Sequence, residues 1–393
     1  MKKQLLCTSA IALGVAAAAP ASAAEWNLDW GGFFNQHVAI GDISVGDPGL
    51  AGTDFDGDGF DLHTNGEIIF SPSIELDNGL TFGVNVQFEA NNGFSVDESY
   101  LTISSDTFGR LVVGSENSAG YLLSTGAPTV HSLFVNSPST STFIPFTGVD
   151  AGPAATGAGV PLVALPFRQA GLSSFTEVQG NNDVQRITYY TPSFNGLTVG
   201  VSYANQGAVN AGNSFSVDTN TVISDIFDIG LNYSQSFGTA DVTFSARYGV
   251  GDAPTTAAAA GDPETWGVGL SVGFGGFTIG GSYGENDNNE IVAGGTAGGF
   301  GDSEGWSLGV AYDAPGPWEF SLETYQSDTD NVAAGGAVIG ETDREAYALA
   351  ASRDLGPGVN WDIYLIYEER DSDLTAFQDV EGTILGTAIN LSF

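Results

Sequence analysis

The chain has 393 residues, and its 47 acidic residues against nine lysines and arginines give a formal net charge of −38. Nucleic-acid binding is excluded, because phosphates need a basic surface that this composition does not supply. A single cysteine excludes an intramolecular disulfide framework.

Residues 1–23 have the pattern of a secretory signal peptide. Lys2 and Lys3 precede an apolar run from Leu5 to Ala19, and Ala21-Ser22-Ala23 follows as a cleavage sequence. Cleavage after Ala23 would remove both lysines and take the net charge from −38 to −40. No later run of about 20 apolar residues predicts a membrane-spanning helix. Residues 24–393 are expected to form one domain.

Hydrophobic alternation with a period of two recurs along residues 24–393. In 265–274 (TWGVGLSVGF), Trp266, Val268 and Leu270 share one strand face, and Gly, Ser and Thr take the other. This pattern is typical of a transmembrane antiparallel β-barrel with lipid outside and water inside. About sixteen strands are predicted, at 26–41, 61–76, 80–90, 95–104, 108–116, 183–192, 196–204, 224–236, 240–250, 264–274, 277–284, 303–313, 318–327, 343–354, 359–369 and 381–393.

Short and long connections alternate between these strands. Short turns are predicted at 77–79, 106–108, 192–196, 237–239, 275–276, 314–317 and 356–358, where Gly, Pro, Asn and Asp recur. Long Gly-, Asp- and Ala-rich loops are predicted at 42–60, 117–182, 205–223, 251–263, 285–302, 328–342 and 370–380. Short periplasmic turns and long extracellular loops are the arrangement of bacterial outer-membrane barrels.

Aromatic residues are spaced along the apolar faces as two girdles would be. Trp266 and Phe274 lie on one face eight residues apart, which is about 20 Å across a bilayer for a tilted strand. The pairs Trp306/Tyr312 and Trp361/Tyr367 repeat the spacing. We expect these side chains at the two membrane interfaces.

Three stretches are similar to the Gram-negative porins common in alphaproteobacteria: VDESYLTISSDTFGRLVVGSEN (96–117), RITYYTPSFNGLTVGVSYAN (186–205) and LGTAINLSF (385–393). The resemblance implies a sixteen-stranded homotrimeric barrel in the outer membrane. It also implies that the third long loop folds into the lumen to narrow it, and that small hydrophilic solutes and ions diffuse through passively.

The 117–182 loop departs from the family pattern. It has about 65 residues, and its acids are Asp150 and Glu177 alone, whereas family constriction loops carry several. It also contains the apolar stretches 143–146 and 161–167. We expect a loop of this length to be functional, and part of it to pack on the barrel wall or at a subunit contact.

Four arginines are predicted on inward faces, since a charge facing lipid costs about 2–4 kcal/mol at the bilayer midplane. The candidate pore-lining and constriction residues are Arg110, Glu116, Asp150, Glu177, Arg186, Arg247 and Arg344. Further inward acids are predicted at Glu67, Glu89, Glu98, Asp228, Glu319, Glu323 and Asp362. These acids and arginines would form an electric field across the pore, here called the pore field. Alternatively, each arginine pairs locally with an acid. Arg353 is expected outward, at the periplasmic rim.

Asp54, Asp56 and Asp58 have the D-x-D-x-D-G spacing of a calcium loop, with Asp61 close by. The motif is incomplete, because its twelfth position is Asn65. The alternative is a chance run in an acidic loop. No cofactor is required by the sequence, and Ca²⁺ at outer loops is the one ion it suggests. Acids of the outer loops could also bind divalent cations that bridge to lipopolysaccharide phosphates.

No catalytic motif is found, because His37, His63 and His131 lie in no recognisable nucleophile or zinc pattern. We therefore expect an outer-membrane channel for small hydrophilic solutes and ions, cation-preferring because of its acidic charge, and not an enzyme. Two alternatives are a substrate-selective nutrient channel and a structural or adhesive surface barrel plugged by the 117–182 loop.

Overall fold

The computed structural model describes residues 25–45, 58–91, 95–141, 144, 165, 167–207, 217, 220–254, 261–289, 299–332, 337–373 and 379–393. These residues form seventeen β-strands and one five-residue helix. Among them, no helix has the length and hydrophobicity needed to cross a membrane. The predicted signal peptide 1–23 lies outside the described residues.

The strands follow one another along the chain with the helix between the sixth and the seventh. They are β1 (Trp30–Val45), β2 (Gly59–Phe70), β3 (Ser73–Glu75), β4 (Thr81–Glu89), β5 (Val96–Ser105), β6 (Gly109–Glu116), α1 (Ala119–Leu123), β7 (Val184–Tyr190), β8 (Leu197–Gln206), β9 (Ser224–Phe237), β10 (Ala240–Asp252), β11 (Glu264–Phe274), β12 (Phe277–Asp287), β13 (Gly299–Asp313), β14 (Trp318–Val332), β15 (Val338–Gly356), β16 (Val359–Ser372) and β17 (Val380–Ser392).

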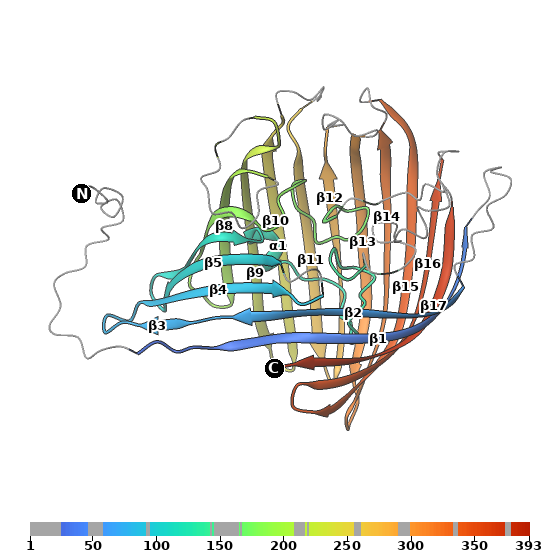
Figure 1. Cartoon of the computed structure of the whole chain (residues 1–393), viewed down its shortest axis with the longest axis horizontal. Helices are drawn as coiled ribbons and strands as arrows, with labels where there is room; N and C mark the ends of the chain where they lie inside the picture. The colour runs from blue at the N-terminus through green and yellow to red at the C-terminus, as the bar shows by residue number, and fades with distance from the viewer. Residues whose placement is uncertain are drawn as a thin grey trace.

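Each strand pairs with its neighbours in the sequence, and the last strand, β17, pairs antiparallel with β1, which closes the sheet into a barrel. Figure 1 shows β1 beside β17. Strands β2 and β3 both pair with β4, so they form one barrel strand interrupted at Ser71-Pro72. Proline cannot donate a ladder hydrogen bond, which accounts for the break. The seventeen segments thus make sixteen barrel strands, and the predicted all-β barrel is confirmed.

The apolar faces of the strands point outward. On β11, Trp266 is 38% exposed and Leu270 is 49% exposed. Thr265 of the same strand, on the opposite face, is fully buried. In a globular β-sandwich the apolar face would be the buried one. Large exposed apolar side chains that alternate with small inward residues form a surface suited to lipid.

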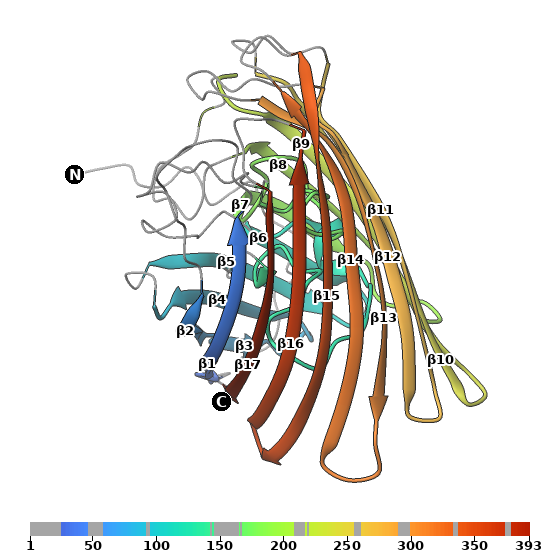
Figure 2. The same ribbon diagram turned by 90° about the vertical axis from the view of Figure 1, so that its right-hand side faces the viewer.

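The two ends of the barrel differ. Short turns join the hairpins at one end, and they lie together at the lower end of strands β10–β16 in Figure 2. Gly275 and Gly276 form the two-residue turn between β11 and β12, with φ angles of 58° and 82° that favour glycine. The long connections, including 117–182, leave from the other end.

Strands near the long-loop end are longer than the sequence predicts. β14 continues to Val332 and β15 begins at Val338, inside the segment 328–342 that was predicted to be loop. Asp328 and Asp343 occupy paired outward positions there, so the hydrophobic alternation ends while the backbone pairing continues. Alternation marks the apolar band of a strand, and hydrogen bonding carries the strand beyond it.

Outward aromatic side chains touch one another from strand to strand. At the turn end, the ring centroid of Phe277 lies 6.5 Å from that of Phe274 and 4.3 Å from that of Tyr312. Nearer the loop end, Trp266 and Tyr283 lie 5.1 Å apart. The described aromatics thus form contacts at two heights, as interface girdles would.

The outward direction of β11 can be tested with Leu270→Arg. This substitution places a charge in the apolar band, so we expect a loss of about 2–4 kcal/mol in unfolding free energy in lipid vesicles. Ser271→Arg, one position along and facing inward, serves as the matched control. Urea unfolding followed by tryptophan fluorescence measures both, and an equal loss from the two variants would contradict the assignment.

Candidate functional site

The described part of the 117–182 loop enters the barrel directly after β6 and begins with α1, which packs against β8, β9 and β10 (Figure 1). The hydroxyl of Ser118 caps the helix by accepting a hydrogen bond from the backbone N–H of Tyr121 at 3.3 Å. Asp228 on the inner face of β9 accepts one from the N–H of Gly120 at 2.5 Å. The start of the loop is therefore seated on the inner wall.

Serines on the inner face of successive strands accept hydrogen bonds from backbone N–H groups of the loop. The bonds run from Thr125, Ala127 and Val130 to Ser245 of β10, Ser307 of β13 and Ser321 of β14, at 2.9, 3.4 and 3.2 Å. Each bond satisfies a donor that would otherwise be held away from water. The loop thus follows the inner wall from β8 to β14.

Inner-face glycines allow this close approach. A Cβ atom at Gly269 would lie 1.8 Å from the carbonyl oxygen of Thr125, and one at Gly230 would lie 2.7 Å from Cα of Gly120. Neither position has room for a side chain. The small inner-face residues, which were predicted to face water, therefore also leave room for the loop backbone.

The far part of the loop is anchored by side chains of the inner wall. His131 Nε2 lies 2.9 Å from Oε1 of Glu323 on β14. Arg344 on β15 donates to the carbonyl oxygens of Val135 at 3.2 Å and Leu172 at 3.0 Å. Because Val135 lies on the outgoing part of the loop and Leu172 on the returning part, one guanidinium holds both.

Apolar residues fill the interior next to β15. Leu133, Val135 and Ile144 of the loop belong to one buried cluster with inner-face alanines and aromatics of the wall. The wall members are Ile43, Tyr325, Ala346, Ala348, Ala350, Tyr364, Ile366, Val380, Ile384 and Ala388. The loop therefore covers the inner face of β14–β17, and this part of the wall faces apolar side chains of the loop.

Glu177 joins the two ends of the loop. Its Oε1 accepts a hydrogen bond from the backbone N–H of Ser118 at 2.9 Å, and its Oε2 lies 3.2 Å from Nη1 of Arg168. The guanidinium of Arg168 also lies over the ring of Tyr121, 4.1 Å from its centroid. Glu177 itself is 1% exposed, so its carboxylate is used inside the loop.

The predicted site residues differ in how they meet solvent. Arg110 is exposed at the inner face, with its guanidinium 5.8 Å from the ring centroid of the inward Tyr190. Arg186, Arg247 and Arg344 are also inward but buried, as is Glu116. Asp150 lies outside the described residues. The role of these residues as a pore field stays a prediction.

Local pairing accounts for part of the buried charge. Arg247 is bonded to Asp228, and Arg344 Nε lies 2.9 Å from Oε1 of Glu368. Arg186 instead donates from Nε to the backbone oxygen of Glu116 at 2.5 Å. Outside the barrel, Arg353 lies over the outward ring of Trp318, 5.4 Å from its centroid.

The calcium-type loop falls mostly outside what the structure describes, since Asp54 and Asp56 are not among the described residues. Asp58 accepts a hydrogen bond from the backbone N–H of Ile43 at 3.2 Å, and Asp61 accepts one from Leu62 at 2.7 Å. Neither belongs to a group of three metal-ligating side chains in the described part of the chain. Calcium at this loop stays a prediction.

The three histidines lie near the same part of the inner wall. The rings of His37 on β1 and His63 on β2 are 5.4 Å apart, and His37 Nδ1 lies 3.1 Å from the hydroxyl of Tyr364. The ring of His131 stacks on Tyr364 at 5.7 Å. This arrangement links the loop to the seam between β1 and β17.

Sequence reasoning placed Glu98 on the inward face but missed Asp97, the adjacent acid, whose carboxylate gathers with inward acids as well. The register of β5 against β4 shifts between Val86 and Phe88, so two residues of β5 stand opposite one of β4. Such a bulge turns both side chains to one side. Two adjacent acids in a transmembrane strand were a usable signal, because strict alternation would leave one facing lipid.

Comparisons with known proteins agree with this architecture. The family profile described as Gram-negative porin matches residues 8–373. No curated protein sequence matches the chain.

Among solved structures, the chain is similar to an anion-selective porin from Comamonas acidovorans, with 14% identity, a TM-score of 0.56 and coverage of 94% of this chain and 100% of that one. The trimer form of OmpT from Vibrio cholerae matches with 12% identity, a TM-score of 0.54 and coverage of 94% and 99%. OmpF of Salmonella typhi in complex with daunomycin matches with 12% identity, a TM-score of 0.56 and coverage of 94% of this chain and 97% of that one.

The seat of the loop can be tested with Gly269→Ala. The added methyl would overlap Thr125, so the loop must shift, and we expect a loss of about 1–3 kcal/mol in unfolding free energy. Gly273→Ala is the matched control on the same face of β11, where the nearest atom to the new Cβ lies at 3.6 Å. Faster proteolysis within 117–182 in Gly269→Ala alone would support the seat, and equal behaviour of the two variants would contradict it.

Proposed function

The chain belongs to the Gram-negative porin family and is an outer-membrane β-barrel channel protein, and from this premise we propose that it passes small hydrophilic solutes and ions by passive diffusion. The observation that carries the proposal is the seating of the 117–182 loop along the inner wall. Barrels of sixteen strands are wide enough to leave an aqueous channel. A loop bonded along β8–β15 narrows such a lumen without having to close it.

A preference for cations is supported by the charges on the inner wall. Two inward arginines, Arg247 and Arg344, are bonded to acids. Glu67, Glu89 and Asp97 are partly exposed on the inner face. Acidic side chains in a pore raise the local concentration of cations.

The anion selectivity of the Comamonas porin is a property of that protein. A similarity at 14% sequence identity shows that the two proteins share a fold, and it does not extend to their ion selectivity. Selectivity in this chain therefore depends on its own side chains, among which arginines are few.

We also propose that the barrel assembles as a homotrimer and contacts lipopolysaccharide. A trimer form is named for the similar OmpT of Vibrio cholerae. Outward acids lie just beyond the loop-end aromatics, where Tyr248 donates to Glu264 at 2.6 Å and Tyr367 donates to Glu369 at 2.8 Å. These carboxylates are placed to meet headgroups of the outer leaflet, with divalent cations bridging the like charges.

Single-channel recording in a planar bilayer under a KCl gradient tests the proposal. An open trimeric porin gives steady conductance in groups of three steps. The sign of its reversal potential is expected to show that cations permeate more readily than anions. A silent bilayer would overturn free diffusion and favour a barrel plugged by the loop. Block of the current by one solute and not by others would favour the nutrient channel.

Arg110→Gln tests which charge the permeating ions encounter. Removing the exposed inner guanidinium should raise the cation-to-anion permeability ratio about fivefold, since a unit charge at ~8 Å in water changes the energies of a cation and an anion by about 0.5 kcal/mol each, in opposite directions. Arg353→Gln, on the outer face, removes the same charge and should leave the ratio unchanged. Reversal potentials measure both, and equal shifts would show that Arg110 does not face the ion path.

A further inference from the structure

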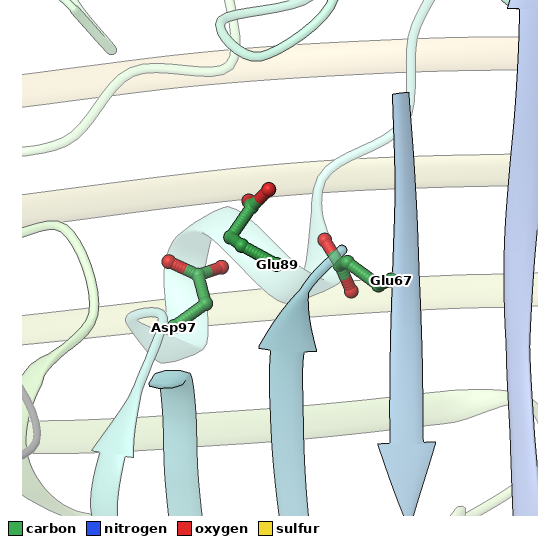
Figure 3. Close-up of side chains that lie close together, drawn as sticks. All are labelled: Glu67, Glu89 and Asp97. Carbon is green, nitrogen blue, oxygen red and sulfur yellow. The ribbon is translucent and has the colours of Figure 1, made fainter. Parts of the chain in front are cut away.

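Five carboxylates from three strands and the end of the 117–182 loop gather on the inner wall. Glu67 of β2, Glu89 of β4 and Asp97 of β5 form one group, in which the ligand oxygens lie within 4.8 Å of one another (Figure 3). Asp97, Glu98 and Asp183 form a second group at the same spacing. Because Asp97 belongs to both, the five residues make one cluster, here called the β5 acid cluster.

One member has an unsatisfied oxygen. Asp183 is 2% exposed, and its Oδ1 is buried without a hydrogen-bond partner. A buried carboxylate oxygen without a donor is unfavourable, because it has lost its hydration. The Asp183 side chain is hydrogen-bonded to that of Glu98, so one of these two carboxyls holds a proton when no cation is bound. A carboxylate oxygen of Asp97 lies within 4.8 Å of ligand oxygens of both acids.

Nearby cationic side chains are already bonded to other groups. Arg168 is bonded to Asn117 and lies 3.2 Å from Glu177, and Arg186 donates to backbone oxygen and to Asn181 at 3.1 Å. Burial raises the pKa of the Asp183 carboxyl, although the Arg168 guanidinium opposes the shift. A bound cation would relieve the same repulsion without a proton.

We propose that the β5 acid cluster binds a divalent metal cation, with Ca²⁺ as the best fit. All the side-chain ligands are carboxylate oxygens, which hard cations prefer. Ca²⁺ takes six to eight oxygen ligands in flexible geometry, whereas Mg²⁺ usually keeps several waters and binds only one or two carboxylates. A cluster of five carboxylates therefore suits Ca²⁺ better than Mg²⁺.

The position of the cluster gives the cation a role at the two ends of the loop. Glu98 accepts a hydrogen bond from Nδ2 of Asn117, the first residue of the 117–182 loop, at 2.6 Å. Asp183 directly follows the last residue of that loop. A cation held between Asp97, Glu98 and Asp183 therefore fastens both ends of the loop to β5.

Calorimetric titration of the EDTA-treated full-length mature protein in detergent with CaCl₂ tests the site. We expect one class of tight sites, and Asp97→Asn/Asp183→Asn should weaken that class by more than about tenfold. Asp241→Asn/Asp354→Asn, which removes two acids near the short turns, is the matched control and should bind as the unaltered protein does. Calcium binding that is unchanged in Asp97→Asn/Asp183→Asn, or absent from the unaltered protein, would overturn the proposal.

Thermal unfolding separates binding from a merely structural role. Ca²⁺ should raise the unfolding temperature of the unaltered protein and the control but not of Asp97→Asn/Asp183→Asn. In EDTA that variant should be at least as stable as the unaltered protein, because it has lost repulsion. A variant less stable in EDTA, together with an unchanged calcium response, would show that the acids serve the fold alone. Asp183→Asn alone repeats the test if the double variant does not fold.

Discussion

The structure depends on one constraint: backbone N–H and C=O groups inside lipid must find partners within the protein. A sheet meets this constraint only when it has no free edge, and here the pairing of β17 with β1 removes the edge. Closure fixes one face of every strand outward and the other inward. The alternating sequence, the aromatic contacts at two heights and the inward position of Arg110 and Arg247 all follow from that division.

Closure alone would leave a wide interior, and the 117–182 loop determines what the interior becomes. The loop is held by many small contributions: serine hydroxyls that accept its N–H groups, glycines that let its backbone approach, and Arg344 between its two parts. An apolar cluster then covers the inner face of β15. The inner wall is thus specialised, with one part holding the loop and another presenting acids.

Basic and acidic side chains are distributed differently in the barrel. The chain has few basic residues, and Arg168, Arg186, Arg247 and Arg344 are all buried where they organise the loop or its wall. Their positive charge is therefore largely used within the protein. Acids are left over on the inner wall near β5 and on the outer rim, which supports both the cation preference and the cation site proposed above.

The sequence by itself determined the barrel, the apolar part of each strand and the direction of its faces, because period-two alternation is a local property of each strand. It also predicted the inward direction of Arg247 and Arg344 from strand phase. Their partners required the tertiary structure, since Glu368 and Asp228 reach them only through strand pairing. Glu177 and Arg168 lie in a loop without periodicity, so no phase could place them. Asp97 and Asp183 meet through a bulge and a returning loop, and only the pairing of β5, β6 and β7 brings the two together.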